Sequence, residues 1–275
     1  MNTTTLSHRA ASRTRGGYGF RTVAQMEWQK LRTVRSTWYI VAIFAAGMIG
    51  LAMLVLSHEN YAQMSAADRA SFDPTHDAFL GLVLGQLLLG ILGVLAITTE
   101  FSSGMIRATF AAAPRRPLVL AAKAAVLGAV TLAAGEISAF AAFFAGQAML
   151  KAPAPHATLG QPGVLRAVLM AGAYSALIAL ISLGIGAIIR HTAGAICALV
   201  GVLFVLPLLF APLSPSIQNT AQKFLPHVMA ANSLAAVKPV AHMLSPGLTF
   251  GLLCAYAMVA LAAGAWAWAL TGRDA

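Results

Sequence analysis

Six long runs of apolar residues stand out along the chain, and each is about 19 to 26 residues long. At a rise of 1.5 Å per residue, a helix of that length crosses a hydrocarbon core of about 30 Å. The pattern therefore predicts an all-α, polytopic membrane protein with six transmembrane helices, at residues 38–56, 78–99, 124–149, 167–189, 194–213 and 248–270.

The composition supports a membrane protein and excludes a soluble one. Hydrophobic residues make up 59% of the 275 residues and charged residues only 9%, whereas a soluble globular chain carries about 25% charged residues. The longest stretch outside the predicted spans is the first 37 residues, and a folded domain needs at least about 50. We therefore expect no folded soluble domain in this sequence.

Basic residues set the expected orientation. The chain has 18 Lys and Arg against 8 Asp and Glu, and thirteen of these basic residues fall on one side of the predicted spans and five on the other. Lys and Arg are enriched in cytoplasmic loops, so both termini are expected in the cytoplasm. The excess positive charge is then a topology signal, and no nucleic-acid partner is expected. The tryptophans expected at this cytoplasmic interface are Trp28, Trp38, Trp266 and Trp268.

Motifs for catalysis or nucleotide binding are missing from the sequence. It contains no G-x-x-x-x-G-K-[ST] loop, no H-E-x-x-H, no G-x-S-x-G and no pair of carboxylates at helical spacing within a span. The histidines are scattered, so no metal site is expected. We predict that the chain is not itself an enzyme, holds no cofactor of its own, and takes any ATP-derived force from another polypeptide.

The region before the first span divides into two parts. Residues 1–19 are rich in Ser, Thr, Arg and Gly, and are expected to be a disordered basic tail. Residues 20–35 show helical spacing of apolar residues, which predicts an amphipathic connecting helix that lies on anionic lipid or packs on a protein partner. Glu27 projects from the apolar arc, so a partner, or basic residues such as Lys30, is expected to neutralise it. The arc consists of Phe20, Val23, Ala24, Leu31 and Val34, with Trp28 at its edge.

The loop at residues 100–123, between spans two and three, holds a second distinctive segment. A capping serine and Pro114 delimit a short helix over residues 104–113. Ile106 and Phe110 are four residues apart, so they are expected to form one exposed apolar step on that helix. The alternative is a solvated turn that carries only topology charges.

Polar residues inside the predicted spans are few, and two of them are candidates for a substrate path or a dimer interface. Glu136 is the one carboxylate deep in a span. A charge at mid-bilayer costs about 2.5 to 3.5 kcal/mol on insertion scales, so Glu136 should face protein or water. Glycines form two stripes on the second span, which favour close helix packing over a pore. Gln86 lies beside one stripe and is expected to hydrogen-bond across that contact.

Two features are predicted in the last third of the chain. Pro207 removes a helical hydrogen bond and is expected to bend the fifth span. The segment at residues 214–246 precedes the last span on the outer side, and its apolar spacing predicts two short helices that are separated before Pro226. The alternative is a plain surface loop.

The stretches AQMEWQKLRTVRSTWY and TEFSSGMIRATFAAAPRRPLVLAAK resemble the connecting helix and the coupling loop of the ABC-2 type permeases, the membrane subunits of ATP-binding-cassette exporters. The resemblance extends to the six spans and the outer segment before the last. It implies two permease copies in the plasma membrane with two separate ATPase subunits, which would bind ATP and Mg²⁺. It also implies export of a drug-like, antibiotic or lipid-like substrate, and so a role in antibiotic resistance. The implied ATPase-coupling residues are Glu100, Gly104, Met105, Ile106, Arg107, Phe110, Arg115 and Arg116, and the implied connecting-helix contacts are Glu27, Trp28, Lys30 and Leu31.

An ion- or proton-coupled secondary transporter is the alternative function. Such a transporter would often show inverted repeats and several titratable groups within the membrane. This sequence has one such carboxylate, and the loops of its two halves do not match. An intramembrane enzyme would need a nucleophile or metal set that the sequence lacks. The residues therefore favour a permease driven by a partner.

Overall fold

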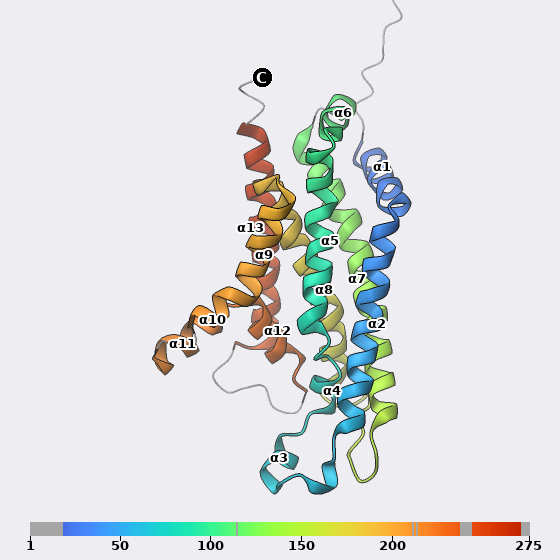
Figure 1. The fold of residues 1–275 in the computed structure, drawn as a ribbon, viewed down its shortest axis with the longest axis vertical. Coiled ribbons are helices and arrows are strands. Elements are labelled where there is room, and N and C mark those ends of the chain that lie inside the picture. Colours follow the sequence, from blue (N-terminus) through green and yellow to red (C-terminus); the bar gives the residue numbers. More distant parts are fainter. Residues whose placement is uncertain (1–18, 114, 211, 213, 237–243, 271–275) are drawn as a thin grey trace, which may run out of the picture.

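The computed structural model describes residues 19–113, 115–210, 212, 214–236 and 244–270. Within these residues every regular element is a helix (Figure 1). The prediction of an all-α chain with six membrane-spanning helices is confirmed, by length and composition. The spans are α2 (Arg35–His58), α5 (Leu82–Ser102), α7 (Arg116–Met149), α8 (Val164–Ile189), the run from α9 to α10 (Thr192–Phe210) and α13 (Pro246–Leu270). The predictions for residues 1–18, for Pro114 and for part of the outer segment lie outside the described residues.

Short helices connect these spans. A separate helix, α1, lies at the residues predicted for the connecting helix, and the segment before the last span contains two helices that are separated before Pro226, as expected. The short elements are α1 (Phe20–Thr33), the 3-10 turn η1 (Tyr61–Gln63), α3 (Ala66–Ser71), α4 (Pro74–Asp77), α6 (Met105–Ala112), α11 (Pro215–Gln222) and α12 (Pro226–Leu234).

The spans form an elongated bundle with α8 near its centre. α5, α7 and α13 all pack against α8, and α2 packs on the outside of α7 (Figure 1). In the most apolar stretch of α8, 67% of the residues are buried inside the protein, against 17% for the fifth span. The core therefore surrounds α8, and the fifth span leaves most of its surface to its surroundings.

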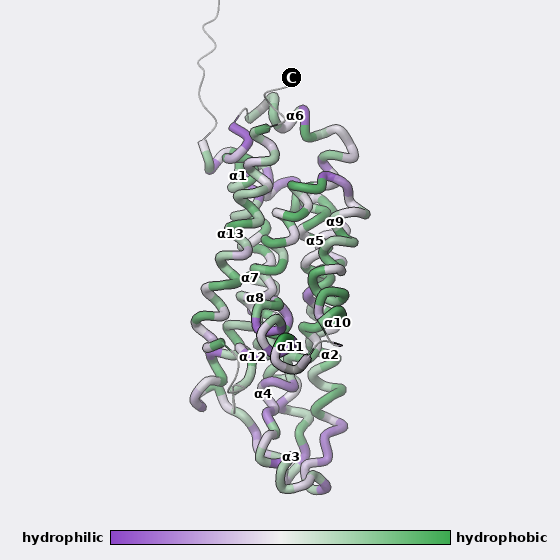
Figure 2. Tube along the Cα trace, turned by 90° about the vertical axis from the view of Figure 1, so that its left-hand side faces the viewer, coloured by the Kyte–Doolittle hydropathy of each residue, from purple (hydrophilic) through white to green (hydrophobic). Residues whose placement is uncertain are grey.

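The two ends of the bundle are the polar parts of the molecule. Figure 2 shows hydrophobic positions along the middle of the helices and hydrophilic ones towards both ends. α1, α6 and the last turns of α13 gather at one end, whereas α3 lies at the other (Figure 1). Because the number of spans is even, the start of the first span and the end of the last span lie at the same end of the bundle. That the end with α1 and α6 is cytoplasmic stays a prediction from the basic residues.

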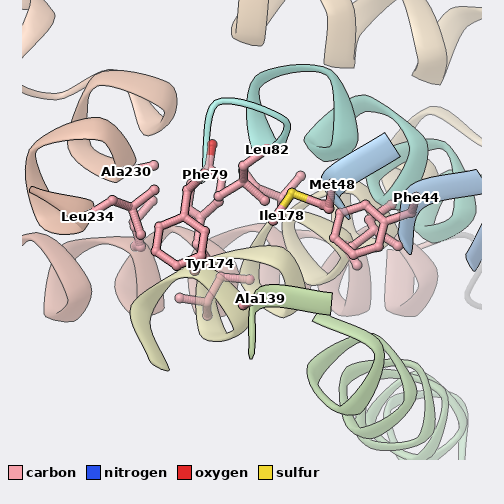
Figure 3. Close-up of a cluster of buried hydrophobic side chains, with 14 of the residues drawn as sticks. Phe44, Met48, Phe79, Leu82, Ala139, Tyr174, Ile178, Ala230 and Leu234 are labelled. Carbon is pink, nitrogen blue, oxygen red and sulfur yellow. The ribbon is translucent and has the colours of Figure 1, made fainter. Parts of the chain in front are cut away.

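Glycines allow α5 to approach three neighbours closely. A Cβ atom on Gly81 would lie 2.9 Å from the Met48 Cα of α2, and a Cβ on Gly85 would lie 2.7 Å from the Phe44 ring. On the other face, a Cβ on Gly90 would meet Leu199 of α9 at 2.6 Å, and Gly93 faces the backbone of α8. The stripes are therefore packing surfaces, as expected. Figure 3 shows part of this packing, where Phe44, Met48 and Ile178 belong to the same buried cluster.

The fifth span is irregular next to its proline. α9 (Thr192–Val200) passes into the π-helical segment η2 (Gly201–Val205), and α10 (Leu206–Phe210) follows. The Leu206 N–H donates to the Gly201 carbonyl, five residues back. Pro207 has no N–H to give, and π-type turns are one way in which a helix absorbs such a break. α10 and α11 extend away from the bundle (Figure 1).

Candidate functional site

The connecting helix α1 packs on the beginning of α7. Val23 is 1% exposed and contacts a small apolar cluster with Ala113, Val119 and Ala122. Other apolar residues of α1 stay outside this contact, since Trp28 is 40% exposed. The predicted amphipathic helix therefore uses one part of its apolar arc against protein and leaves another part uncovered.

An elbow at Val34 separates α1 from α2. Val34 adopts an extended conformation, which ends the helix two residues before the predicted boundary at residue 35. The Trp38 indole N–H donates to the Arg32 carbonyl at 3.1 Å and so joins the two helices across the bend. The elbow sets the angle at which α1 meets the bundle.

Four charged side chains from three helices meet beneath α1, and we call them the charge cluster: Glu27, Lys30, Glu100 and Lys123. Lys30 Nζ donates to Glu27 Oε1 at 2.7 Å and to Glu100 Oε1 at 3.0 Å. Lys123 Nζ donates to Glu27 Oε2 at 2.5 Å and to Glu100 Oε1 at 2.6 Å. Thr109 of α6 joins the charge cluster, because its hydroxyl accepts from Lys30 at 3.3 Å and donates to Glu100 at 3.4 Å. The charge cluster thus ties α1, α5, α6 and α7 together.

The charge cluster is electrically balanced and mostly buried. The side chains of Glu27, Glu100 and Lys123 are 3–4% exposed, whereas that of Lys30 is 30% exposed. Burial would lower the pKa of Lys30, but its hydrogen bonds to Glu27 and Glu100 and their charges outweigh burial and raise the pKa above its ordinary value. Two charges of each sign sum to zero. Removing one partner would therefore leave a buried charge uncompensated.

The prediction of an exposed apolar step on α6 is wrong. Ile106 is only 8% exposed and belongs to the main buried core. Phe110 is half-buried and packs edge-on against Trp268 of α13, with ring centroids 5.4 Å apart. The spacing of the two residues places them on one face, but that face points at the bundle. Their apolar area is covered by the protein's own helices.

Trp268 is the residue that covers this face. Its ring also packs against Phe101 at a centroid distance of 5.9 Å, and its indole N–H donates to the Ala187 carbonyl at 3.1 Å. The Arg116 guanidinium lies 4.8 Å from the Phe110 ring centroid and donates to the Trp268 carbonyl at 2.8 Å. Trp268, expected at headgroup level, is 1% exposed. It lies at the expected end of the bundle but inside the protein.

The outer face of α6 carries two of the implied coupling residues, Met105 and Arg107, together with two alanines. Met105 is 44% exposed, and Arg107, Ala108 and Ala111 are also exposed. Gly104 begins the helix with a φ of 71°, a left-handed conformation that glycine adopts without steric cost. We call Met105, Arg107, Ala108 and Ala111 the outer face of α6.

The other predicted contact residues divide between buried and exposed positions. Glu100, one of the implied ATPase-coupling residues, is 2% exposed, because its carboxylate pairs with two lysines inside the bundle. Arg115 is exposed next to α6. Of the connecting-helix residues, Leu31 is half-buried against the core and Trp28 faces outwards. Neutralisation of Glu27 by Lys30 is confirmed.

The sequence prediction missed Lys123 as a partner of Glu27. Lys123 is the last residue of the predicted loop at residues 100–123, but α7 starts earlier, at Arg116, and carries Lys123 within its buried face. The only local signal in the sequence is an isolated lysine among the alanines of residues 121–125, and this signal does not name its partners. Its partners on α1 and α5 lie 96 and 23 residues away in the sequence.

The polar residues in the middle of the spans have separate surroundings. Gln86 is 1% exposed, and its side chain accepts a hydrogen bond from the Tyr174 hydroxyl of α8 at 2.5 Å, which confirms the expected bond across this contact. Glu136 lies against Gly172 of α8, where a Cβ atom would come within 2.6 Å of its Oε1. Its Oε2 is buried and has no hydrogen-bond partner among the described residues. The structure brings neither residue to the charge cluster.

The charge cluster is not arranged as a metal site. Among the described residues, no group of three or more His, Cys, Asp or Glu is arranged to hold a metal ion. The charge cluster itself contains two lysines, which repel a cation. No protein-family model matches the chain, and no curated protein matches it at a significant level.

Proposed function

We propose that this chain is the membrane subunit of an exporter that is driven by a separate ATPase. The observation that carries the proposal is the charge cluster, which fastens α1 and α6 to two of the spans at one end of the bundle. A multi-pass helical protein needs such a connection if force applied outside the membrane is to move its spans. The resemblance of these two segments to the connecting helix and coupling loop of ABC-2 type permeases points the same way.

The packing of α6 supports transmission of a push. Ile106 is embedded in the core, and Phe110 reaches α13 through Trp268. Thr109 reaches α1 and α5 through Lys30 and Glu100. Packed elements of this kind shift as units between discrete arrangements. A force on the outer face of α6 would therefore reach α5, α7 and α13 together.

The outer face of α6 is the proposed docking surface for the ATPase. Its exposed side chains are small apart from Met105 and Arg107. Burying the Met105 side chain completely would contribute about 1.5–3 kcal/mol, which is too little for stable association once ordering costs are deducted. The ATPase would therefore also contact α1, whose exposed residues include Gln25, Gln29 and Arg32. We propose a second copy of this chain in the assembly, on the resemblance alone.

Co-purification with a candidate ATPase subunit tests the proposal. The assembled complex in lipid vesicles should hydrolyse ATP in a vanadate-sensitive manner, and drug-like or lipid-like compounds should stimulate hydrolysis. Ala108→Asp places a charge on the outer face of α6 without removing a packed side chain. It should abolish co-purification and leave the unfolding temperature unchanged.

A matched variant controls for the added charge. Ala67 is exposed on α3 at the other end of the bundle, so Ala67→Asp should retain the ATPase. Retention of the ATPase by both variants would remove α6 from the docking surface. Uphill transport by the chain alone in liposomes would overturn the proposal as a whole.

One observation favours the second candidate function, an ion- or proton-coupled transporter. Glu136 lies near the middle of a span, and its buried Oε2 has no partner among the described residues. Intramembrane carboxylates of this kind often carry protons. Transport driven by a pH gradient without ATP, and lost in Glu136→Gln, would establish this alternative.

A further inference from the structure

A cavity of about 230 Å³ lies under α1, next to the charge cluster. Most of its wall is apolar, and α1, α2, α5, α6 and α7 all contribute to it. Its open side is marked by lining residues that are exposed: Val34, Ser36, Thr99 and Met105. The apolar lining consists of Leu31, Val34, Leu92, Leu95, Ala96, Met105 and Val126.

The charge cluster lines one part of the cavity, and one of its four side chains is partly exposed. Glu27, Glu100 and Lys123 line the cavity but are almost completely covered, whereas the Lys30 side chain is 30% exposed. Of these four side chains, a molecule that enters the cavity therefore reaches that of Lys30 most easily, and an anionic group would compete there with the neutral Thr109 hydroxyl for one N–H. This accessibility favours an anionic group on the ligand.

The surroundings of the cavity reinforce this preference. The exposed charged residues of α1, of α6 and of the segments beside them are all basic within the described part of the chain: Arg21, Arg32, Arg35, Arg107 and Arg115. The carboxylates described at this end are the two buried ones of the charge cluster. Each basic residue near a membrane surface attracts anionic headgroups by about 1 kcal/mol, which corresponds to about fivefold in binding.

We infer that this cavity binds a membrane amphiphile with an anionic headgroup. The carboxylate or phosphate would lie at Lys30, and the apolar chain would follow Leu92, Leu95 and Ala96 of α5. Ligand pockets usually have volumes of about 300–1,000 Å³, so a cavity of this size takes part of one chain and leaves the rest in the bilayer. The site differs from general adsorption of α1 on lipid, because it has a defined wall and a defined charge.

The site has a consequence for the proposed ATPase contact. Met105 lines the cavity and also belongs to the outer face of α6. A bound amphiphile would therefore contact the helix on which the ATPase is proposed to dock. This consequence rests on the proposed function, whereas the binding itself does not.

Photolabelling of the purified chain in nanodiscs tests the binding without any ATPase. Three probes would carry a diazirine on identical chains, with a carboxylate, a phosphate monoester or a neutral alcohol as headgroup. Mass spectrometry should locate the label on α5 at residues 92–99. Both anionic probes should label these residues about fivefold more than the alcohol does. Equal labelling by all three probes, or label spread evenly over the lipid-facing helices, would overturn the inference.

Two variants separate the wall of the site from its charge. Ala96→Phe fills the cavity and should reduce labelling at residues 92–99 about tenfold, because the added ring occupies the space that the chain of the probe would take. Ala133 is exposed on α7 away from the cavity, so Ala133→Phe should label as the unmodified chain does. Unchanged labelling of Ala96→Phe would remove the site from this cavity.

The charge variant keeps the charge cluster balanced. Glu27→Gln together with Lys30→Gln removes one charge of each sign and leaves the pair of Glu100 and Lys123, so folding is expected to survive. This double variant should label equally with the anionic and neutral probes. A preserved preference for the anionic probes would show that Lys30 does not select the headgroup. Loss of ATPase binding in any variant with normal labelling would count against the proposed function and leave the amphiphile site intact.

Discussion

The two ends of helix α5 are held in the protein by opposite means. At Gly81, Gly85, Gly90 and Gly93 the helix has no side chains, and neighbouring helices approach its backbone directly. At Glu100 the same helix extends a long charged side chain into the charge cluster. The glycine contacts depend on shape alone, whereas the charge cluster depends on a balance that other residues can restore. The comparison indicates that the glycine region tolerates no added side chain, whereas the charge cluster tolerates a change that keeps its charges balanced.

The largest expected effect is at the charge cluster. Lys123→Met leaves Glu27 and Glu100 with Lys30 alone, and breaking a buried ion pair in this way costs about 3–5 kcal/mol. The unfolding temperature and the yield of folded chain in detergent should fall sharply. Adding Glu27→Gln restores neutrality around the pair of Lys30 and Glu100, so it should recover most of the loss. If the double variant is no more stable than Lys123→Met, the cluster is not held by charge balance.

A slightly smaller effect is expected at the glycine region. Gly93→Leu forces a side chain against the Ala179 backbone of α8, and overpacking of this kind costs about 3 kcal/mol. Gly50 of α2 has nothing within 4 Å of a Cβ position, so Gly50→Leu is the matched control and should be stable. No single substitution on α8 should rescue Gly93→Leu, because the clash is with backbone. If a smaller side chain at residue 182 rescued Gly93→Leu, a second substitution would restore the glycine region as it is expected to restore the charge cluster, and the contrast between them would fail.

The bond between α5 and α8 should contribute less than either contact. Tyr174→Phe removes the donor to Gln86 and leaves a buried acceptor unpaired, at a cost of about 1 kcal/mol within a membrane protein. Thermal unfolding in detergent measures the change. Tyr39 is 65% exposed, so Tyr39→Phe should have no effect and serves as the control. An equal loss of thermal stability in both variants would show that the hydrogen bond to Gln86 does not stabilise the protein.

The smallest effect is expected at the end of the bundle that carries α3 and α4, where a partly exposed pair offers a contrast to the buried cluster. The hydrogen bond that the His76 ring donates to the Asp77 carboxylate raises the pKa of His76 above its ordinary value, and this outweighs the effect of burial. A raised folded pKa means that the stabilisation is complete below about pH 6.5 and is lost as the pH rises through the raised pKa. The difference in unfolding temperature between the unmodified chain and His76→Gln should therefore shrink from pH 5.5 to pH 8.5. A difference that grows with pH would contradict this assignment.

The regular parts of the fold were predictable from the sequence because their signals are local. A run of apolar residues long enough to cross a bilayer forms a helix wherever it lies in the bundle. The glycine stripes of α5 and the break before Pro226 are also readable from neighbouring residues. The first span, for example, was expected at residues 38–56 and is observed at Arg35–His58.

The candidate site was only partly predictable. Glu27 on an apolar arc correctly indicated a nearby countercharge, and Lys30 lies one turn away. The second countercharge, Lys123, could not be identified, because which face of α7 meets α1 depends on how the helices pack. The apolar pair on α6 was identified as a contact surface but assigned to a partner, since spacing shows that two side chains share a face without showing what covers it.

The sequence by itself determined the class of protein, the number of spans and the presence of two unusual segments next to them. These properties are sums over neighbouring residues, namely hydrophobic length, helical period and the density of basic residues. Only the tertiary structure decided that Ile106 and Phe110 face inwards, that Trp268 covers them, and that four charges from α1, α5 and α7 meet under the connecting helix. Those contacts join residues far apart in the chain, so they exist only once the helices have packed against one another.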